Sequence, residues 1–265
     1  MKLTKSTVLA ALIVLFSFNL SFAYKRVVLL APDVADIFHK LNLDNVVVGK
    51  TKNVKLFKNA KIVGTHLSVN TEILISLKPD LIVARRKTEF DASKLKGVKI
   101  LIYNPHTLKG IIKEIKLIGK MFNRGKKAEE LTKNLLDKIK QLKPIKHKPK
   151  VVFEIMQTPY LVAGKKCIVN DIIQTAGGIN IINKNRMFVR TLQENILLKK
   201  PDIYIYEVGP MNKNPTPPNK RAIFKDTSML IVKVDESKFL RSNTVSFDSV
   251  VYLNNLFYEW SKNRK

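Results

Sequence analysis

Residues 72–83 read EILISLKPDLIV, and residues 194–205 read ENILLKKPDIYI. Both stretches follow the pattern E-x5-K-P-D and continue into an apolar run, and they begin 122 positions apart. The pattern predicts a short helix that ends before the proline, because the residue preceding a proline is pushed out of the α region. Pro-Asp then predicts a turn, and the apolar run predicts a buried strand. The repeat indicates that the chain has two halves built on one plan.

Further apolar runs lie on both sides of each copy. They predict strands at residues 26–30, 46–48, 81–83, 99–103, 150–155 and 203–205. Helical patterns lie between and after them, at residues 34–41, 107–121, 167–176 and 247–260. Continuous apolar strands that alternate with helices are typical of an α/β fold whose largely parallel sheets are covered by helices on both faces. We therefore expect an α/β protein with a mostly parallel sheet in each half.

The segment between the halves has a different composition. Residues 126–142 read KKAEELTKNLLDKIKQL, with an apolar stripe at helical spacing and charges on the other face, and Pro144 and Pro149 end the pattern. We expect an N-terminal lobe over 24–120, one long linker helix within 121–148, and a C-terminal lobe over 149–265. Two such lobes leave a cleft between them, where ligands preferentially bind.

The first 23 residues predict a signal peptide for export. Lys2 and Lys5 form a positive start, and the unbroken apolar run at 8–16 is shorter than the roughly 20 residues that span a bilayer. Ser21 and Ala23 supply small residues where a signal peptidase cuts. We expect cleavage near Ala23 and a soluble periplasmic or otherwise extracytoplasmic protein, with an uncleaved N-terminal anchor as the alternative.

The chain is strongly basic, with 48 Lys and Arg against 21 Asp and Glu, a net charge of +27. Such a surplus is typical of proteins that bind polyanions, and lysine enrichment that only maintains solubility is the other interpretation. The lysines are spread along the chain, and export separates it from nucleic acid, so we expect no nucleic-acid partner. The single cysteine, Cys167, excludes a disulfide scaffold and a four-cysteine zinc site.

Four segments in order resemble a known family. Residues 26–49 are similar to its opening strand, cleft loop and first helix, residues 63–84 to its most recognisable segment, residues 118–131 to the turn into its linker helix, and residues 163–182 to the second lobe's first helix with its Gly-Gly stop. The set resembles the extracytoplasmic substrate-binding proteins of ABC importers for cobalamin, ferric siderophores and haem, the class III periplasmic binding proteins with a helical backbone.

The resemblance implies transport without catalysis. Such a protein is a monomer without an intrinsic cofactor, captures a metal chelate (ferric siderophore, haem or cobalamin) in its cleft, and docks on an ABC permease dimer in the inner membrane. In this family one surface glutamate of each lobe pairs with arginines of the permease, and Glu72 and Glu194 occupy the matching positions. Two acidic residues at equivalent places suit a two-fold partner. The alternative is that each glutamate only complements the dipole of its helix.

Candidate ligand contacts follow the carboxyl ends of the expected strands, because these loops face the ligand in open α/β sheets. Those of the N-terminal half are Pro32, Asp33, Thr65, His66, Arg85 and Arg86. Those of the C-terminal half are Tyr160 and Glu207. Arg186, which we expect to face the cationic loop at 85–87, and the aromatic Phe188 are further candidates of that half.

These side chains suit an anionic metal chelate. The two neighbouring arginines suit carboxylate, catecholate or phosphate oxygens, although a solvated loop is the alternative. His66 can ligate a metal as a neutral imidazole, or it is an ordinary surface residue. Relatives carry an arginine or a tyrosine in the stretch that matches Thr65 and His66, and this chain has neither there. Tyr160 and Phe188 either stack on a flat ligand or pack in the core.

Two other classes of function stay open. A secreted enzyme of the commoner kinds would carry G-x-S-x-G or H-E-x-x-H, and the chain has neither motif, so we expect no catalysis. A basic polyanion-binding or oxyanion-binding protein that reuses the fold would lose affinity steeply as the salt concentration rises.

Overall fold

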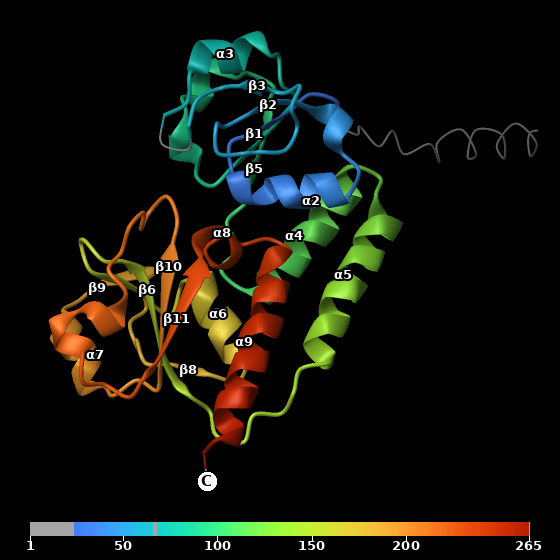
Figure 1. Ribbon diagram of the computed structural model, residues 1–265. Helices are drawn as coiled ribbons and strands as arrows, with labels where there is room; N and C mark the ends of the chain where they lie inside the picture. Colours follow the sequence, from blue (N-terminus) through green and yellow to red (C-terminus); the bar gives the residue numbers. More distant parts are fainter. Residues whose placement is uncertain (1–23, 66–67, 265) are drawn as a thin grey trace, which may run out of the picture.

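The computed structural model describes residues 24–65 and 68–264, arranged as two α/β lobes, one above the other in Figure 1. The expected signal peptide and His66 lie outside the described residues. No helix of the described part combines the length and the apolar character that crossing a bilayer requires.

The sheet of the N-terminal lobe is parallel throughout. It contains β1 (Val27–Leu29), β2 (Val47–Lys50), β3 (Lys61–Ile62), β4 (Leu81–Ala84) and β5 (Lys99–Ile102), in the order β3-β2-β1-β4-β5. Helix α2 (Ala35–Lys40) packs against one face, and α3 (Thr71–Ser76) packs against the other. Strands β1 and β4 are buried along their whole length, as their continuous apolar sequence predicts.

The sheet of the C-terminal lobe is mostly parallel. It contains β6 (Lys150–Met156), β7 (Leu161–Ala163), β9 (Phe188–Arg190), β10 (Ile203–Val208) and β11 (Leu230–Asp235), in the order β11-β10-β6-β7-β9, and β8 (Ile179–Asn180) also pairs with β6. The pairs β6–β7 and β7–β9 are antiparallel. Its helices are α6 (Ile168–Thr175), α7 (Gln193–Leu198), α8 (Glu236–Phe239) and α9 (Val245–Lys262). The expected α/β class is therefore confirmed.

The two lobes share helices and one continuous core. Between the sheets the chain forms α4 (Leu108–Met121) and α5 (Gly125–Lys140), which a three-residue turn joins as an antiparallel pair. Helix α5 lies where the linker helix was expected, and α9 runs beside it (Figure 1). Buried side chains from both sheets and from all three helices belong to one hydrophobic cluster. Short 3₁₀ helices lie at Pro32–Val34, Asp44–Val46, Lys87–Glu89, Ala92–Lys94, Pro218–Lys220 and Ala222–Phe224.

Hydrogen bonds also join the lobes directly. Asp36 Oδ2 accepts from Thr244 Oγ1 at 2.6 Å, and Asp171 Oδ2 accepts from Leu108 N at 2.7 Å. The Tyr103 hydroxyl donates to the carbonyl oxygen of Ser242. Because these bonds sit on the shared core, the lobes are held as one unit.

The repeated K-P-D unit performs the same task in each lobe. Asp80 Oδ2 accepts from the backbone N–H of Lys25, and Asp202 Oδ2 accepts from that of Lys150, both at 2.7 Å. Each aspartate thereby fixes the turn against the start of the first strand of its own sheet. The expectation that the two stretches form equivalent helix–turn–strand units is confirmed.

Candidate ligand-binding cleft

A cavity of about 470 Å³ opens between the two lobes. Its volume lies within the range of about 300–1,000 Å³ that is usual for small-molecule sites. On the N-terminal lobe the polar lining is Asp33, Asn53, Arg85, Asn104 and His106, and Pro32 adds an apolar side chain. On the C-terminal lobe the apolar lining is Ile168, Met187, Phe188, Pro210, Met211 and Leu240. Cys167, Glu236, Arg241 and Ser242 complete the lining.

The N-terminal wall is built where three adjacent parallel strands end. Asp33 follows β1, Arg85 follows β4, and His106 follows β5. Because the carboxyl ends of parallel strands meet at one edge of a sheet, these side chains converge on the cleft.

A carboxylate and a guanidinium form an ion pair on this wall. Arg85 Nη2 donates to Asp33 Oδ2 at 2.5 Å, and the aspartate is buried while the guanidinium is partly exposed. The other carboxylate oxygen, Asp33 Oδ1, is buried and has no hydrogen-bond partner within residues 24–65 and 68–264. The wall therefore offers a planar cation that is already oriented by a buried acid.

His106 is a residue of the cleft that the sequence analysis missed. It is half-buried, and burial together with the positive charges of Lys166 and Arg85 lowers its pKa below the ordinary value. Its imidazole is consequently neutral near pH 7 and has a ring nitrogen available to a metal. The signal was present in the sequence, because His106 stands just beyond an expected strand, as Arg85 does.

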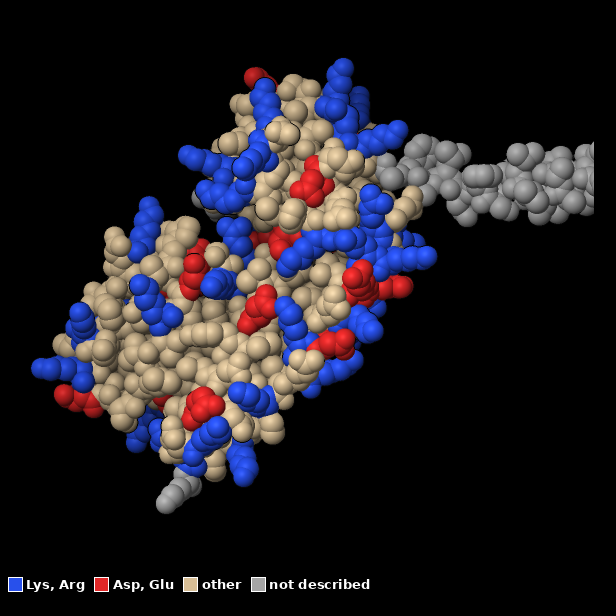
Figure 2. All heavy atoms as spheres, turned by 45° about the vertical axis from the view of Figure 1, so that its right-hand side comes forward, with Lys and Arg blue, Asp and Glu red and all other residues tan. Residues whose placement is uncertain are grey.

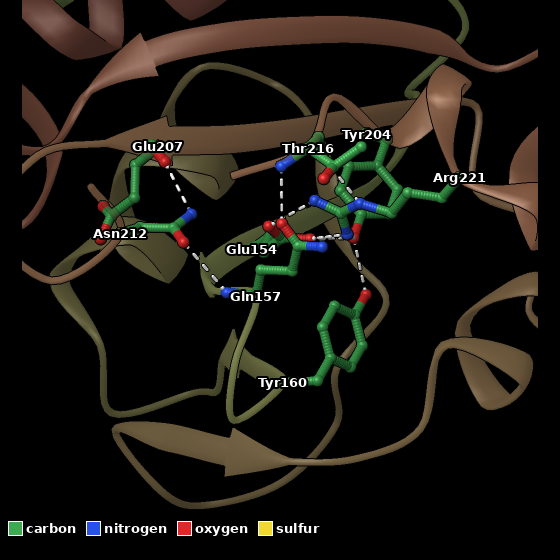
Figure 3. A network of polar contacts seen from close by, with 8 residues as sticks. All are labelled: Glu154, Gln157, Tyr160, Tyr204, Glu207, Asn212, Thr216 and Arg221. Atoms are coloured by element: carbon green, nitrogen blue, oxygen red, sulfur yellow. Dashed lines mark hydrogen bonds and ion pairs between the residues drawn. The ribbon is translucent and has the colours of Figure 1, made fainter. Parts of the chain in front are cut away.

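The opposite wall depends on the loop that follows β10. Asn212 Nδ2 donates to the carbonyl oxygen of Glu207 at 2.8 Å, and Asn212 Oδ1 accepts from Gln157 N at 3.1 Å. Gln157 Oε1 accepts from Thr216 N at 2.6 Å, so the loop is attached to the sheet at several points (Figure 3). This attachment places Met211 in the wall of the cleft.

A buried ion pair anchors the far end of the same loop. Arg221 Nη1 and Nη2 lie 2.5 and 2.8 Å from the two carboxylate oxygens of Glu154, and the Tyr204 hydroxyl donates to Glu154 (Figure 3). The Tyr160 hydroxyl lies 2.8 Å from that of Tyr204. Burial raises the pKa of both tyrosines. Tyr160 therefore belongs to this network, and it does not line the cleft.

Glu207 also faces the interior. It is fully buried, and neither carboxylate oxygen has a hydrogen-bond partner in the described part of the chain. Burial, followed by the charges of Glu236 and Glu154, raises its pKa to about 10. The group is thus a neutral carboxylic acid at physiological pH.

The expected ligand contacts are divided by the structure. Pro32, Asp33, Arg85 and Phe188 line the cleft. The described candidates outside its lining are Thr65, Arg86, Tyr160, Arg186 and Glu207. Glu72 and Glu194 are exposed in the first turns of α3 and α7, and neither lines the cleft. Helices α3 and α7 lie at the outer edges of the two lobes in Figure 1.

Cys167 lines the cleft from the N-cap position of α6 but is chemically inert there. Burial raises the pKa of its thiol to about 12, so it carries no thiolate at neutral pH. Among the described residues no group of three or more His, Cys, Asp or Glu side chains is arranged to hold a metal ion.

Comparison with known proteins identifies the family of this chain. The model of the family described as "Periplasmic binding protein" matches residues 27–217. The chain belongs to this family. The family resemblance drawn from the sequence is therefore confirmed.

Proteins of similar sequence include one from a haem-uptake system. The high-affinity heme uptake system protein IsdE of Staphylococcus aureus (strain bovine RF122 / ET3-1) is 35% identical over 178 residues, which are 62% of this chain and 60% of that protein. The match thus spans about 60% of the length of this curated relative.

Solved structures extend the likeness over both lobes. The crystal structure of S. aureus IsdE complexed with heme superposes with a TM-score of 0.76 at 26% identity, covering 88% of this chain and 98% of that one. The vitamin B12 binding protein BtuF of Vibrio cholerae superposes with a TM-score of 0.69 at 17% identity, covering 91% and 99%, and shares the fold. The family description and the haem-uptake relative favour binding over catalysis.

Proposed function

We propose that this protein is the substrate-binding component of an ABC importer, which captures a metal chelate between its lobes outside the cytoplasm and delivers it to a membrane permease. The observation that carries the proposal is the cleft, where the strand ends of one lobe face an apolar wall of the other. The chain belongs to the periplasmic binding protein family and is 35% identical to a protein of a haem-uptake system, and both facts support a ligand that is transported.

The chemistry of the lining suits a flat, apolar chelate with anionic groups at its edge. Ile168, Phe188 and Leu240 offer apolar surface to the face of such a molecule. Arg85 and Arg241 offer guanidinium groups to its carboxylates. Haem has this shape and charge, and its iron is commonly held by histidine or methionine. His106 on one wall and Met187 or Met211 on the other are the donors that face it. We therefore place haem first among the chelates expected from the sequence.

The distribution of charge on the face that Figure 2 shows favours the cleft over a polyanion-binding surface there. Lys and Arg side chains are scattered over the face that Figure 2 shows, and acidic side chains lie among them. A polyanion-binding protein usually gathers its cations in one patch or stripe.

Delivery requires a docking face on each lobe. Glu72 and Glu194 are exposed and stand at equivalent positions of two equivalent units. We assign to them the pairing with cationic residues of a two-fold permease dimer.

A thermal-shift panel tests the proposal. Residues 24–265 are melted with haemin, cobalamin, ferric catecholate and hydroxamate siderophores, and simple oxyanions. Binding to the native state stabilises it by about 2.7 kcal/mol at a ligand concentration of a hundred times Kd. One selective response, with haemin the expected ligand, supports a cleft receptor. No response to any of these ligands would overturn the proposal, and a salt-sensitive response to every anion would overturn it in favour of a basic surface that binds anions unselectively.

A further inference from the structure

Helices α3 and α7, which carry the proposed docking glutamates, have equivalent backbones but expose different side chains. In both α3 and α7, each of six residues, the glutamate is the second residue, and the aliphatic residue two places later is buried: Leu74 in α3 and Ile196 in α7. The lysine that precedes the K-P-D proline has a φ of 45° at Lys78 and 47° at Lys200. The same surface positions of the two lobes can therefore be compared one by one.

One pair of surface positions is apolar in both lobes. Ile75 follows Glu72 by three residues and is 40% exposed, and Leu197 follows Glu194 by three residues and is 37% exposed. Residues three apart on a helix are neighbours on its surface. Each glutamate therefore has an exposed aliphatic side chain beside it.

Two further positions are apolar only in the C-terminal lobe. Leu192 and Leu198 are 63% and 79% exposed, the highest values of any large apolar side chain that the structure describes. The matching positions of the other unit hold Asn70 and Ser76. Leu198 follows Glu194 by four residues and is its neighbour on the helix surface, and Leu192 lines one hollow together with Glu194. Exposed apolar side chains around one acid mark an interaction surface.

A hollow lies next to this apolar surface. It has a volume of about 470 Å³, and its lining includes Leu192, Glu194, Tyr160 and Arg221. Tyr160 and Arg221 belong to the buried network around Glu154, so these two lining residues are held in place by hydrogen bonds. A preformed hollow beside an exposed acid suits a partner that inserts a side chain next to a cation.

We propose that docking on the permease is asymmetric, and that the α7 face, defined by Leu192, Glu194, Leu197 and Leu198, is the dominant contact. The partner is a two-fold membrane protein that presents the same cation, flanked by apolar side chains, to each lobe. The α7 face desolvates more apolar surface around its acid than α3 does, so the C-terminal lobe binds more tightly. This inference rests on the proposed function.

The test uses cells of the source organism from which the gene for this protein has been deleted. Each variant is expressed in them at a low level, and the uptake of ⁵⁵Fe-haemin is measured. Leu192→Gln with Leu198→Gln is expected to lower uptake by about tenfold. Ile75→Gln on α3 is expected to lower it less, and Leu136→Gln, an exposed residue of α5, is the matched control that leaves it unchanged. Ser76→Leu gives α3 the leucine that α7 has, and is expected to raise uptake when the protein is limiting.

Haemin affinity of each purified variant separates docking from ligand binding. It is expected to be unchanged in all of them, because none of the substituted residues lines the cleft. If the α7 double variant transports as well as Leu136→Gln, or if Ile75→Gln costs as much as the double variant, the asymmetry is wrong while the proposed function stands. If the unsubstituted protein neither binds haemin nor restores uptake, the proposed function is wrong, and the asymmetric docking that rests on it is wrong as well.

Discussion

Arg85 Nη2 lies 2.5 Å from Asp33 Oδ2, so the main cation of the N-terminal wall is held by an acid from the neighbouring strand end. A rigid, partly exposed guanidinium of this kind loses little freedom when a ligand carboxylate arrives. The pair therefore orients the arginine for an anionic edge of the proposed chelate.

Replacing this arginine should weaken the binding of carboxylated chelates. Arg85→Ala is expected to raise the Kd for haemin by about tenfold to a hundredfold, because a hydrogen bond to a charged group contributes about 1.5–3 kcal/mol. Fluorescence quenching or absorbance titration measures the change. Arg86→Ala is the matched control, since Arg86 is exposed and lies outside the cleft lining. Equal losses in the two variants would contradict the assignment of Arg85 to the site.

The neutral imidazole in the cleft gives a spectroscopic prediction. His106→Ala is expected to shift the Soret band of the bound haemin and to weaken binding, because an iron ligand is lost. His147→Ala removes an exposed histidine far from the cleft and should leave the spectrum unchanged. Identical spectra for the unsubstituted protein and His106→Ala would show that the iron is ligated elsewhere.

The buried ion pair beneath the loop after β10 should be important for stability. Glu154→Gln leaves the buried Arg221 without its counter-ion, which costs about 3–5 kcal/mol of folding free energy. For a chain of this length that corresponds to a melting temperature lower by about 10 °C. Glu259→Gln breaks an exposed pair with Lys262 and should change little. Calorimetry measures the melting temperatures of both variants. Similar values would refute a stabilising role for the pair of Arg221 and Glu154.

Glu207 predicts how stability depends on pH. Its pKa is raised from 4.5 to about 10 in the fold, so the unfolded chain releases the proton at a pH where the folded chain retains it. The contribution of the neutral acid is complete below pH 4.5 and declines as pH rises toward 10, by at most about 1.4 kcal/mol per pH unit.

Denaturant unfolding between pH 5 and pH 9 measures this decline. Glu207→Gln keeps a neutral side chain of the same shape and is expected to flatten the decline, whereas Glu130→Gln, an exposed change on α5, should keep the slope of the unsubstituted protein. A slope that Glu207→Gln does not alter would show that Glu207 is not the group responsible.

The shared core predicts a small closing movement on ligand binding. Helices α4, α5 and α9 contribute to one cluster with both sheets, and the hydrogen bond from Thr244 to Asp36 ties the lobes together. Scattering profiles with and without haemin are expected to differ little, because continuous helices do not absorb the φ/ψ changes of a loop hinge. A large compaction on binding would contradict this.

Much of the fold was predictable because its signals are local. The two K-P-D units and the continuous apolar strands specified the α/β class, and the expected helices at 107–121 and 167–176 correspond to α4 and α6. The antiparallel strands β7 and β9 were not expected, because runs of three residues carry too little periodicity to be recognised.

The site was predictable on one wall only. The strand-end rule identified Asp33 and Arg85, and it would have identified His106 had it been applied after residues 99–103. The other wall takes Met211, Leu240 and Arg241 from loops and from the end of a one-turn helix, for which no strand end gives a signal. Sequence position alone also did not reveal which way side chains face, so Tyr160 and Glu207 were expected near the ligand although both point into the protein.

Titration of haemin into residues 24–265, followed by the Soret absorbance at low and high salt, tests the central claim most directly. A receptor that binds its chelate in the cleft is expected to saturate at one equivalent, with an affinity that changes little between about 0.05 and about 0.5 M salt. The absence of a break at one equivalent, or an affinity that falls steeply with salt, would contradict a cleft receptor for haem.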